Sequence, residues 1–407
     1  MEGLDSPEFP SQVPYDWETR SKYLDLPFPI SEYERRLGQI RERMERSKLD
    51  SIIVFGNAAD YGDVVYLSNF IPFGKAAIIV SREKNREPEI ITDAILHGEP
   101  INSYAWMTWM RDFRPVKHDP VKFAEAVRNL LFEAGAKRVG IVGMDNFPMN
   151  IWARLEIECS DVEWVDFWLD FVSMKSVRSD SEIKLQREIG KITATAMRAA
   201  VESISSGRTE CEVAGVAYET MLNLGAHDRS FQTIVSSGRR GGLKHSYPTQ
   251  RRIDRGDLVY LDMGAMKFGY QCDMSRSVVI GGANAEQKEV LDVVLNGYQV
   301  LSSMMKPGVK MGEIVLRARE LEQEQKDLRA RYEGRMYLGL IVHHAIATSF
   351  FELPSLGLPD VTLEKNMSFA FEPMAHILDF GTAVIEDTLV ITESGVESLT
   401  PYELVHW

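Results

Sequence analysis

The chain has few cysteines, no cluster of basic residues and no long apolar run. Its three cysteines, Cys159, Cys211 and Cys272, are scattered over 407 residues, so we expect core residues and neither a disulfide framework nor a thiolate metal site. The net charge of -14, with no basic stripe, argues against nucleic-acid binding. Because no apolar run reaches about 18 residues and no basic leader precedes an apolar stretch, we expect a cytoplasmic protein without membrane contact.

The length predicts two domains, since 407 residues exceed the usual size of one hydrophobic core. Five prolines among Asp, Glu and Ser in residues 1–29 favour an extended arm. From residue 30 to 174, apolar strand patterns (SIIVFG, KAAIIVS, RVGIVG) alternate with amphipathic helix patterns, which predicts an α/β domain.

Three capping-box patterns predict helix starts, at Ser31 with Glu34, Ser179 with Glu182, and Thr209 with Glu212. The change of character around MKSVRSDSEI places a domain boundary near residue 175, so the second domain covers 175–407. We find no internal repeat.

The stretch LVYLDMGAMKFGYQCDMSRSVV, residues 258 to 279, reads as a β-hairpin that carries two aspartates. If the turn is centred between Lys267 and Phe268, Asp262 lies directly opposite Asp273. Like charges at opposed positions destabilise a hairpin, and a divalent cation between them would turn that repulsion into a binding site. The alternative is a solvated hairpin whose aspartates face water.

Further charged residues lie in apolar strand patterns. LIVHHAIA carries His343 and His344 on opposite faces, MSFAFEPMAHI carries Glu372, and AVIEDTLVI carries Glu386 beside Asp387. Each residue alone would fit a satisfied core group or a strand edge. Together they require compensating partners, because a buried carboxylate is costly when unpaired.

This ordered set resembles the five-ligand pattern of the pita-bread metallopeptidase family, which includes methionine aminopeptidase, aminopeptidase P, prolidase and the metal-free creatinase. HHAIATSFFELP is similar to the family's His-Gly-Ile-Gly motif that ends in Glu-x-Pro, and MKSVRSDSEI resembles its interdomain motif. The resemblance implies a creatinase-type α/β N-terminal domain and an α+β pita-bread catalytic domain. It also implies a homodimer, for which we expect the contact at the aromatic stretch from Trp106 to Phe113.

The resemblance also implies roles for single residues. Asp262 would hold one metal ion, Asp273 and Glu386 would bridge two, and His344 with Glu372 would hold the second. Such a donor set suits manganese, with iron, cobalt or zinc as alternatives, and two ions would generate a bridging hydroxide near neutral pH. Glu372 would also carry a proton to the leaving nitrogen.

His245, seventeen residues before Asp262, stands where the family has a histidine that stabilises the tetrahedral intermediate. Without the resemblance, a single loop histidine would be read as a surface residue.

The chain departs from the family around the substrate. Phe351 replaces a second histidine, and Val384 replaces an arginine, which removes a charge and five hydrogen-bond donors. Ala345 and Ala347 replace the motif's glycines. We also expect Tyr270 and His343 near the substrate.

We therefore predict a dinuclear metal hydrolase that cleaves a C–N bond of a small amide, imide or dipeptide-like compound. An Xaa-Pro dipeptidase or aminopeptidase is the first alternative. A dimethylsulfoniopropionate lyase is another, although that branch has an aspartate at the position of Gly264. A non-catalytic binding module and creatinase-like hydrolysis without metal are disfavoured by the complete ligand set.

Overall fold

The computed structural model describes residues 17–93, 108–243, 245–341, 343–349, 352–355 and 360–407. The chain divides into two compact units, Met1–Met174 and Lys175–Trp407. We describe each unit by itself.

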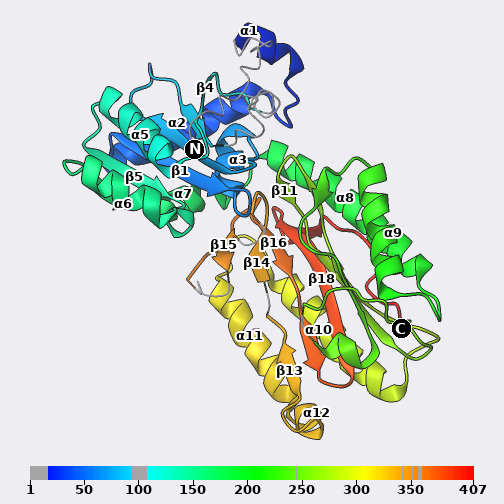
Figure 1. Ribbon diagram of the computed structural model, residues 1–407. Helices are drawn as coiled ribbons and strands as arrows, with labels where there is room; N and C mark the ends of the chain where they lie inside the picture. Colours follow the sequence, from blue (N-terminus) through cyan, green and yellow to red (C-terminus); the bar gives the residue numbers. More distant parts are fainter. Residues whose placement is uncertain (1–16, 94–107, 244, 342, 350–351, 356–359) are drawn as a thin grey trace, which may run out of the picture. The chain divides into compact units, whose positions relative to one another are not determined.

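The first unit is built on a mixed six-stranded sheet with the order β4-β3-β2-β1-β5-β6. Strand β1 pairs in parallel with β5 and antiparallel with β2 (Figure 1). The strands are β1 Ser51–Asn57, β2 Lys75–Ser81, β3 Glu89–Thr92, β4 Asp112–Pro115, β5 Arg138–Val142 and β6 Glu163–Asp166. The helical segments are α1 Trp17–Arg20, η1 Ser21–Tyr23, α2 Ile30–Arg46, α3 Gly62–Ser68, α5 Pro120–Glu133, η2 Met144–Asn146, α6 Met149–Glu158 and α7 Trp168–Lys175.

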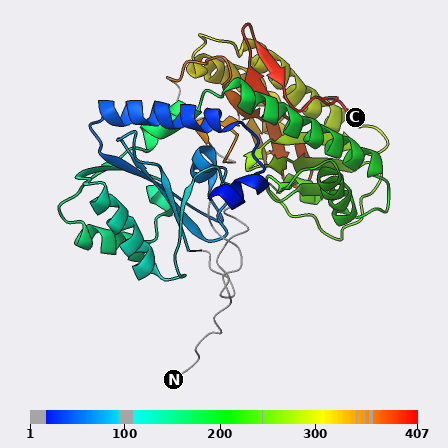
Figure 2. The same cartoon turned by 90° about the horizontal axis from the view of Figure 1, so that it is seen from above.

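Helices cover both faces of this sheet. Ile53 and Phe55 of β1 pack with residues of α5 and α6 in one apolar cluster, and Figure 2 shows α2 on the opposite side of the sheet. The alternation of side chains along a buried strand supplies apolar contacts to both helical layers. The α/β pattern expected for this unit is confirmed.

Two sequence expectations for this unit, the extended arm and the first capping box, differ from the structure. Residues 1–16 of the arm lie outside the described residues, but Trp17–Arg20 and Ser21–Tyr23 form short helical turns in a stretch without proline. The capping box predicted at Ser31 is wrong: α2 begins at Ile30 after an N-cap at Pro29, two residues before the predicted N-cap. Proline at that position starts the helix by its fixed φ.

The aromatic stretch proposed as a dimer contact is only partly described, since Trp106 lies outside the described residues. Trp109 is buried, stacks on Tyr33 with ring centroids 5.7 Å apart, and donates from its indole nitrogen to the carbonyl of Leu67 at 2.8 Å. Phe113 packs edge-on against Phe70. Trp109 therefore belongs to the unit's own core and cannot present its indole to a partner.

The second unit contains an antiparallel sheet whose main path runs β15-β14-β16-β18-β12-β9-β8, with β13, β17 and β19 joined to it (Figure 1). A small sheet, β11-β10-β7, extends the β9–β12 hairpin. The strands are β7 Asp228–Arg229, β8 Ile234–Ser237, β9 Leu258–Met263, β10 Ala265–Lys267, β11 Tyr270–Gln271, β12 Met274–Val279, β13 Met336–Gly339, β14 His343–Ala345, β15 Glu352–Ser355, β16 Ser368–Phe371, β17 Met374–Ile377, β18 Gly381–Ile391 and β19 Val396–Ser398.

Three long helices pack on this sheet. Helices α8 (Asp180–Ser203) and α9 (Glu210–Asn223) contact the half that contains β8 to β12, and α10 (Ala285–Met304) contacts β17 and β18. The remaining helical segments are α11 Met311–Glu324, α12 Lys326–Arg331 and η3 Gly238–Gly242. The capping boxes predicted at Ser179 and Thr209 are both formed. In the described part of the chain, no helix has the length and apolar character needed to cross a lipid bilayer.

The hairpin has a different register from the one expected. Its turn is the pair Phe268 and Gly269, both with positive φ, which is the geometry of a tight two-residue hairpin loop. As a result Asp262 lies opposite Ser275, and Asp273 is its diagonal neighbour. Because side chains alternate with a period of two, this shift of two residues leaves both aspartates on the same face.

A buried ion cluster holds the segment that follows His344. Glu352 accepts hydrogen bonds from the backbone nitrogens of Thr348 and Ser349 at 3.0 and 2.9 Å, pairs with Lys175 at 3.1 Å and also pairs with Arg178. The pKa of Glu352 results from opposed effects: burial raises it, but the charges of Arg178 and Lys175 outweigh burial and lower it to about 2. The cluster therefore ties the start of the second unit to this segment.

Replacing Glu352 with Ala should destabilise the second unit by about 3–5 kcal/mol, because it removes the carboxylate that pairs with both Lys175 and Arg178 in the core. The folded pKa lies below the ordinary value of 4.5, so the stabilisation is present above about pH 4.5 and is lost as pH falls through about 2. Urea unfolding of both proteins between these pH values measures the difference.

The control is Glu397→Ala, which breaks the half-exposed pair with Arg187 and should cost less than about 1 kcal/mol. An equal loss in the two variants would contradict the importance of the buried cluster.

Candidate metal centre

Three carboxylates form a row across the central strands of the second unit. Asp262 on β9 lies opposite Ser275 on β12, which in turn lies opposite Glu386 on β18. Glu372 follows Phe371, whose partner on β18 is Asp387, so it extends this row beside Glu386. Directly opposed residues share a face of a sheet. Asp262, Glu386 and Glu372 therefore project from one face.

A second row lies two residues further along β18. His344 on β14 pairs with Ala370, and Ala370 pairs with Thr388. The hydroxyl of Thr388 accepts from the backbone nitrogen of Asp273 and donates to its carbonyl, both at 2.9 Å. His344 and Asp273 thus lie in one row, on the same face as the first because Thr388 is two residues after Glu386.

The two rows bring the five predicted ligands together in two overlapping groups. Asp273, His344 and Glu386 form one, and Asp262, Glu372 and Glu386 form the other; within each, one ligand atom per residue lies within 4.8 Å of the rest. The resemblance places Glu372 with His344, whereas here Glu372 groups with Asp262. Glu386 belongs to both groups, and the bridging role of Asp273 stays a prediction.

The electrostatics of these groups fit divalent cations. Burial raises the pKa of Asp262 and of Glu386 well above the ordinary range, with the charge of Asp273 as the next cause, and burial raises the pKa of Asp273 to about 7. One oxygen of Asp262 and one of Asp273 have no hydrogen-bond donor among the described residues although both are buried. A carboxylate-rich donor set with one imidazole suits divalent cations.

Neighbouring hydroxyls orient two of the carboxylates. Tyr260 donates to Oδ2 of Asp262 at 2.6 Å, and Ser275 donates to Oε2 of Glu386 at 2.7 Å. The ring of Tyr260 packs with Ile234 and Met374. Such outer contacts fix the orientation of a ligand and commonly tune its affinity for metal. Sequence reasoning did not identify either hydroxyl. The two-residue spacing within β9 does place Tyr260 and Asp262 on the same face of the strand, and this signal could have identified Tyr260.

Asp387, the neighbour of Glu386, faces the other way. Its carboxylate accepts from Arg276 at 2.9 Å, from Tyr298 at 2.5 Å and from Thr400 at 2.9 Å. Arg276 is fully buried and also donates to the carbonyl of Glu386 at 2.6 Å. Asp387 is therefore a structural counter-ion below the carboxylate cluster.

A cavity of about 260 Å³ adjoins the cluster and contains His245. Asp262 forms part of its wall, so the two predicted residues, seventeen positions apart, reach the same space. Apolar and polar side chains complete the lining: Phe231, Gln232, Ile234, Ser246 and Tyr247.

The residues expected near the substrate occupy different places. Tyr270 is buried and donates to Glu182 of α8 at 2.8 Å. His343 is buried on the face of β14 opposite His344, lies edge-on to Phe369, and has a pKa lowered to about 4 by burial. Val384 belongs to the apolar cluster of Tyr260. Phe351 lies outside the described residues. Substrate contact by any of these residues stays a prediction.

Comparison with known families assigns both units. The family model of metallopeptidase family M24 matches residues 184–393, which is half of the chain. The chain belongs to metallopeptidase family M24. The model of the creatinase/prolidase N-terminal domain matches residues 36–174 of this M24 protein. Family membership makes the chain a metal-dependent hydrolase, and the predicted fold class is confirmed.

Several relatives of this M24 protein carry functional names. An Xaa-Pro dipeptidase from Pyrococcus horikoshii is 28% identical over 370 residues, covering 90% of this chain and 97% of the relative. One from Pyrococcus furiosus is 33% identical over 231 residues, covering 56% and 64%. The crystal structure of the prolidase from Pyrococcus horikoshii OT3 matches with a TM-score of 0.78 at 26% identity, covering 91% of this chain and 99% of that one.

Removing divalent metal should destabilise the M24 domain more as pH rises. The folded pKa values of Asp262, Asp273 and Glu386 lie above their ordinary values, so the stabilisation that their protons give the metal-free fold is fully present below about pH 4. The part that comes from Asp273 is lost as pH rises through about 7. Bound metal replaces the lost protons. The difference in Tm between manganese-loaded and metal-free protein should therefore grow from about pH 5 to about pH 8. A constant difference would contradict the metal centre.

Replacing Tyr260 with Phe should weaken metal affinity about 10- to 100-fold, because Asp262 loses the hydroxyl that orients it while the ring keeps its packing. Titration calorimetry with manganese measures the change. Tyr298→Phe is the matched control: it removes an equally buried Tyr-to-Asp hydrogen bond on the other face and should leave metal affinity unchanged. A similar affinity loss in both variants would point to general loosening of the fold.

Proposed function

We propose that the protein is a dinuclear metal hydrolase that cleaves the C–N bond of an Xaa-Pro dipeptide or a closely related dipeptide-like substrate. The observation that carries this proposal is the pair of overlapping ligand groups beside the cavity that His245 and Asp262 share. The relatives named Xaa-Pro dipeptidase support the choice of substrate.

Divalent cations held by Asp262, Asp273, His344, Glu372 and Glu386 would supply Lewis acidity and lower the pKa of water at neutral pH. The chain's own residues would do the rest. His245 would donate a hydrogen bond to the oxygen of the reacting carbonyl, where negative charge develops. Glu372, the most accessible carboxylate of its group, would carry a proton to the leaving nitrogen.

A second candidate is a small amide or peptide without a free carboxylate next to the scissile bond. Val384 favours it: the side chain is fully buried among Ile234, Tyr260 and Met374 and offers no cation at this position. A substrate carboxylate would therefore lack the arginine that the family pattern has there. Amides and peptides extended beyond proline avoid this cost.

The lyase alternative is disfavoured by backbone packing. A Cβ atom on Gly264 would lie 1.8 Å from the carbonyl oxygen of Cys272. The additional aspartate of that branch therefore cannot be accommodated at this position without moving the hairpin.

Manganese as the native metal, the homodimer and the cytoplasmic location stay predictions. The donor set is also compatible with iron, cobalt or zinc.

The test compares Ala-Pro, Ala-Pro amide and a tripeptide with proline second, each with metal-free protein reloaded with manganese. The dipeptidase proposal predicts that Ala-Pro is cleaved at least about tenfold faster than the amide, as kcat/KM. The reverse order would favour the second candidate, because the amide has no carboxylate to satisfy.

Asp262→Asn is the control and should abolish turnover, since it removes a charged ligand atom from the centre. If the wild-type protein binds about two metal ions per chain and cuts none of the three compounds, cleavage of the proline bond is wrong.

A further inference from the structure

The loop that carries His245 begins and ends at neighbouring points of the fold. We define the His245 loop as the described residues 237–243 and 245–249, from the last residue of β8 through η3 to Thr249. His245 is exposed and has φ +57°, in the left-handed region that costs free energy for a residue with a side chain. Contacts that fix the loop therefore stabilise this conformation.

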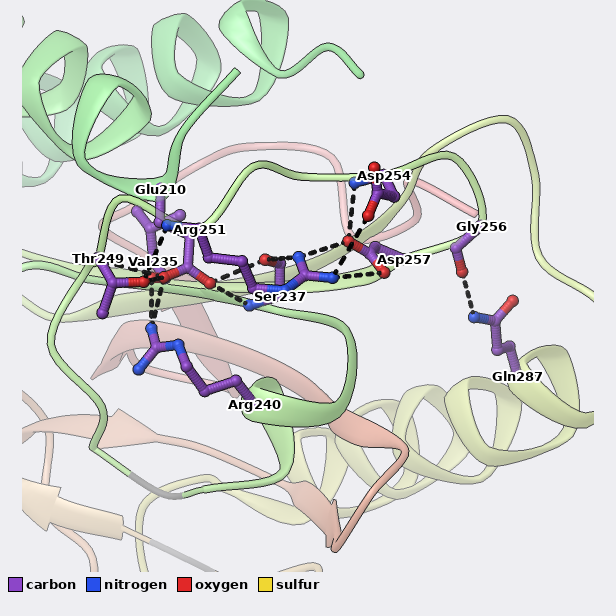
Figure 3. A network of polar contacts seen from close by, with 10 residues as sticks. All are labelled: Glu210, Val235, Ser237, Arg240, Thr249, Arg251, Asp254, Gly256, Asp257 and Gln287. Carbon is purple, nitrogen blue, oxygen red and sulfur yellow. Dashed lines mark hydrogen bonds and ion pairs between the residues drawn. The ribbon is translucent and has the colours of Figure 1, made fainter. Parts of the chain in front are cut away.

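Glu210, in the first turn of α9, joins the two ends of the loop (Figure 3). Its Oε1 accepts from the backbone nitrogen and the hydroxyl of Ser237, at 2.9 and 2.8 Å. Its Oε2 accepts from the backbone nitrogen and the hydroxyl of Thr249, at 3.0 and 2.7 Å. Glu210 is fully buried, so its carboxylate accepts these bonds away from solvent.

Arg240 adds a contact next to His245 itself. Its Nη2 donates to Oε2 of Glu210 at 2.6 Å and to the carbonyl of Tyr247 at 2.8 Å. One guanidinium therefore connects the carboxylate to the residue two positions after His245.

The same network reaches the strand of the predicted ligand Asp262 (Figure 3). Arg251 donates to the hydroxyl of Ser237 at 2.5 Å and to Asp257 at 2.6 Å, and Asp257 directly precedes β9. One network of hydrogen bonds therefore joins the segments that carry His245 and Asp262, and both residues line the same cavity.

A purely structural role for Glu210 would be to stabilise the N-terminus of α9. Glu212 already does this: its carboxylate accepts from the backbone nitrogen of the N-cap Thr209 at 2.7 Å. Among the described residues, the five hydrogen bonds that the Glu210 carboxylate accepts all come from the His245 loop. We propose that Glu210 and Arg240 are positioning residues that hold His245 against the reacting carbonyl, an inference that rests on the proposed function.

The first test is kinetic and uses Glu210→Gln beside Glu212→Gln. The amide that replaces the Glu210 carboxylate has an NH2 group in place of one acceptor oxygen, so this group would face hydrogen-bond donors of Ser237 or Thr249. The loop should then shift, and kcat should fall about 10- to 100-fold while KM changes little. Glu212→Gln weakens the same helix start without touching the loop, so its kcat should stay within about twofold of the wild type. Equal losses of kcat would overturn the proposal.

A double-mutant cycle separates positioning from general destabilisation. If Glu210 acts through His245, adding Glu210→Gln to His245→Ala should change kcat by less than about twofold. A further loss equal to that seen in the wild-type background would overturn the proposal, because it would place the effect outside His245.

Hydrogen exchange provides a readout that needs no substrate. Amides of the His245 loop should exchange at least about tenfold faster in Glu210→Gln than in the wild type or in Glu212→Gln. Unchanged exchange would refute the role of Glu210 in fixing the His245 loop, even if peptides are cleaved. If exchange rises and the wild-type protein cleaves no peptide, Glu210 does fix the loop and the proposed function is wrong.

Discussion

The repulsion among buried carboxylates is the constraint on which the second unit depends. Asp262, Asp273 and Glu386 share one face of the sheet, and burial raises the pKa of each, so protons or cations among the oxygens stabilise this cluster. The register of β9, β12 and β18 creates the crowding, because it places Asp262, Ser275 and Glu386 in one row. The hydroxyl of Ser275 between them separates two carboxylates while it binds one of them. A metal centre is the arrangement that resolves this strain at neutral pH.

Strand β18 shows how alternation assigns opposite roles to adjacent acids. Glu386 projects to the ligand face, whereas Asp387 projects to the core, where Arg276, Tyr298 and Thr400 saturate its oxygens. Arg276 connects the two faces, since the same guanidinium binds the Asp387 side chain and the Glu386 carbonyl. Glu386, a predicted ligand, therefore lies on a strand whose backbone Arg276 binds from the core side, as a preorganised site requires.

Buried glutamates contact the two loops beside the centre. Glu352 binds the segment that follows His344, and Glu210 binds the His245 loop. Each accepts hydrogen bonds from backbone and hydroxyl groups and pairs with an arginine. Carboxylates that accept several such bonds are strong local organisers because each bond is charge-assisted. The predicted metal ligands lie on or next to strands, whereas the candidate catalytic histidine lies on a loop, which Glu210 contacts at both ends.

The sequence by itself determined the elements that depend on local chemistry and pattern. Capping boxes at Ser179 and Thr209, the apolar strands, and the charged residues inside them were all readable, because propensity and periodicity act over a few residues. The resemblance added the order of the five ligands. Only the tertiary structure decided the hairpin register, the grouping of Glu372 with Asp262, and the separate fates of Glu386 and Asp387. It also decided the roles of Glu210 and Arg276. Ser237 lies 27 residues after Glu210 in the chain, and Glu386 lies 110 residues after Arg276. Such contacts depend on which strands pair and in which register, and local sequence does not encode that choice.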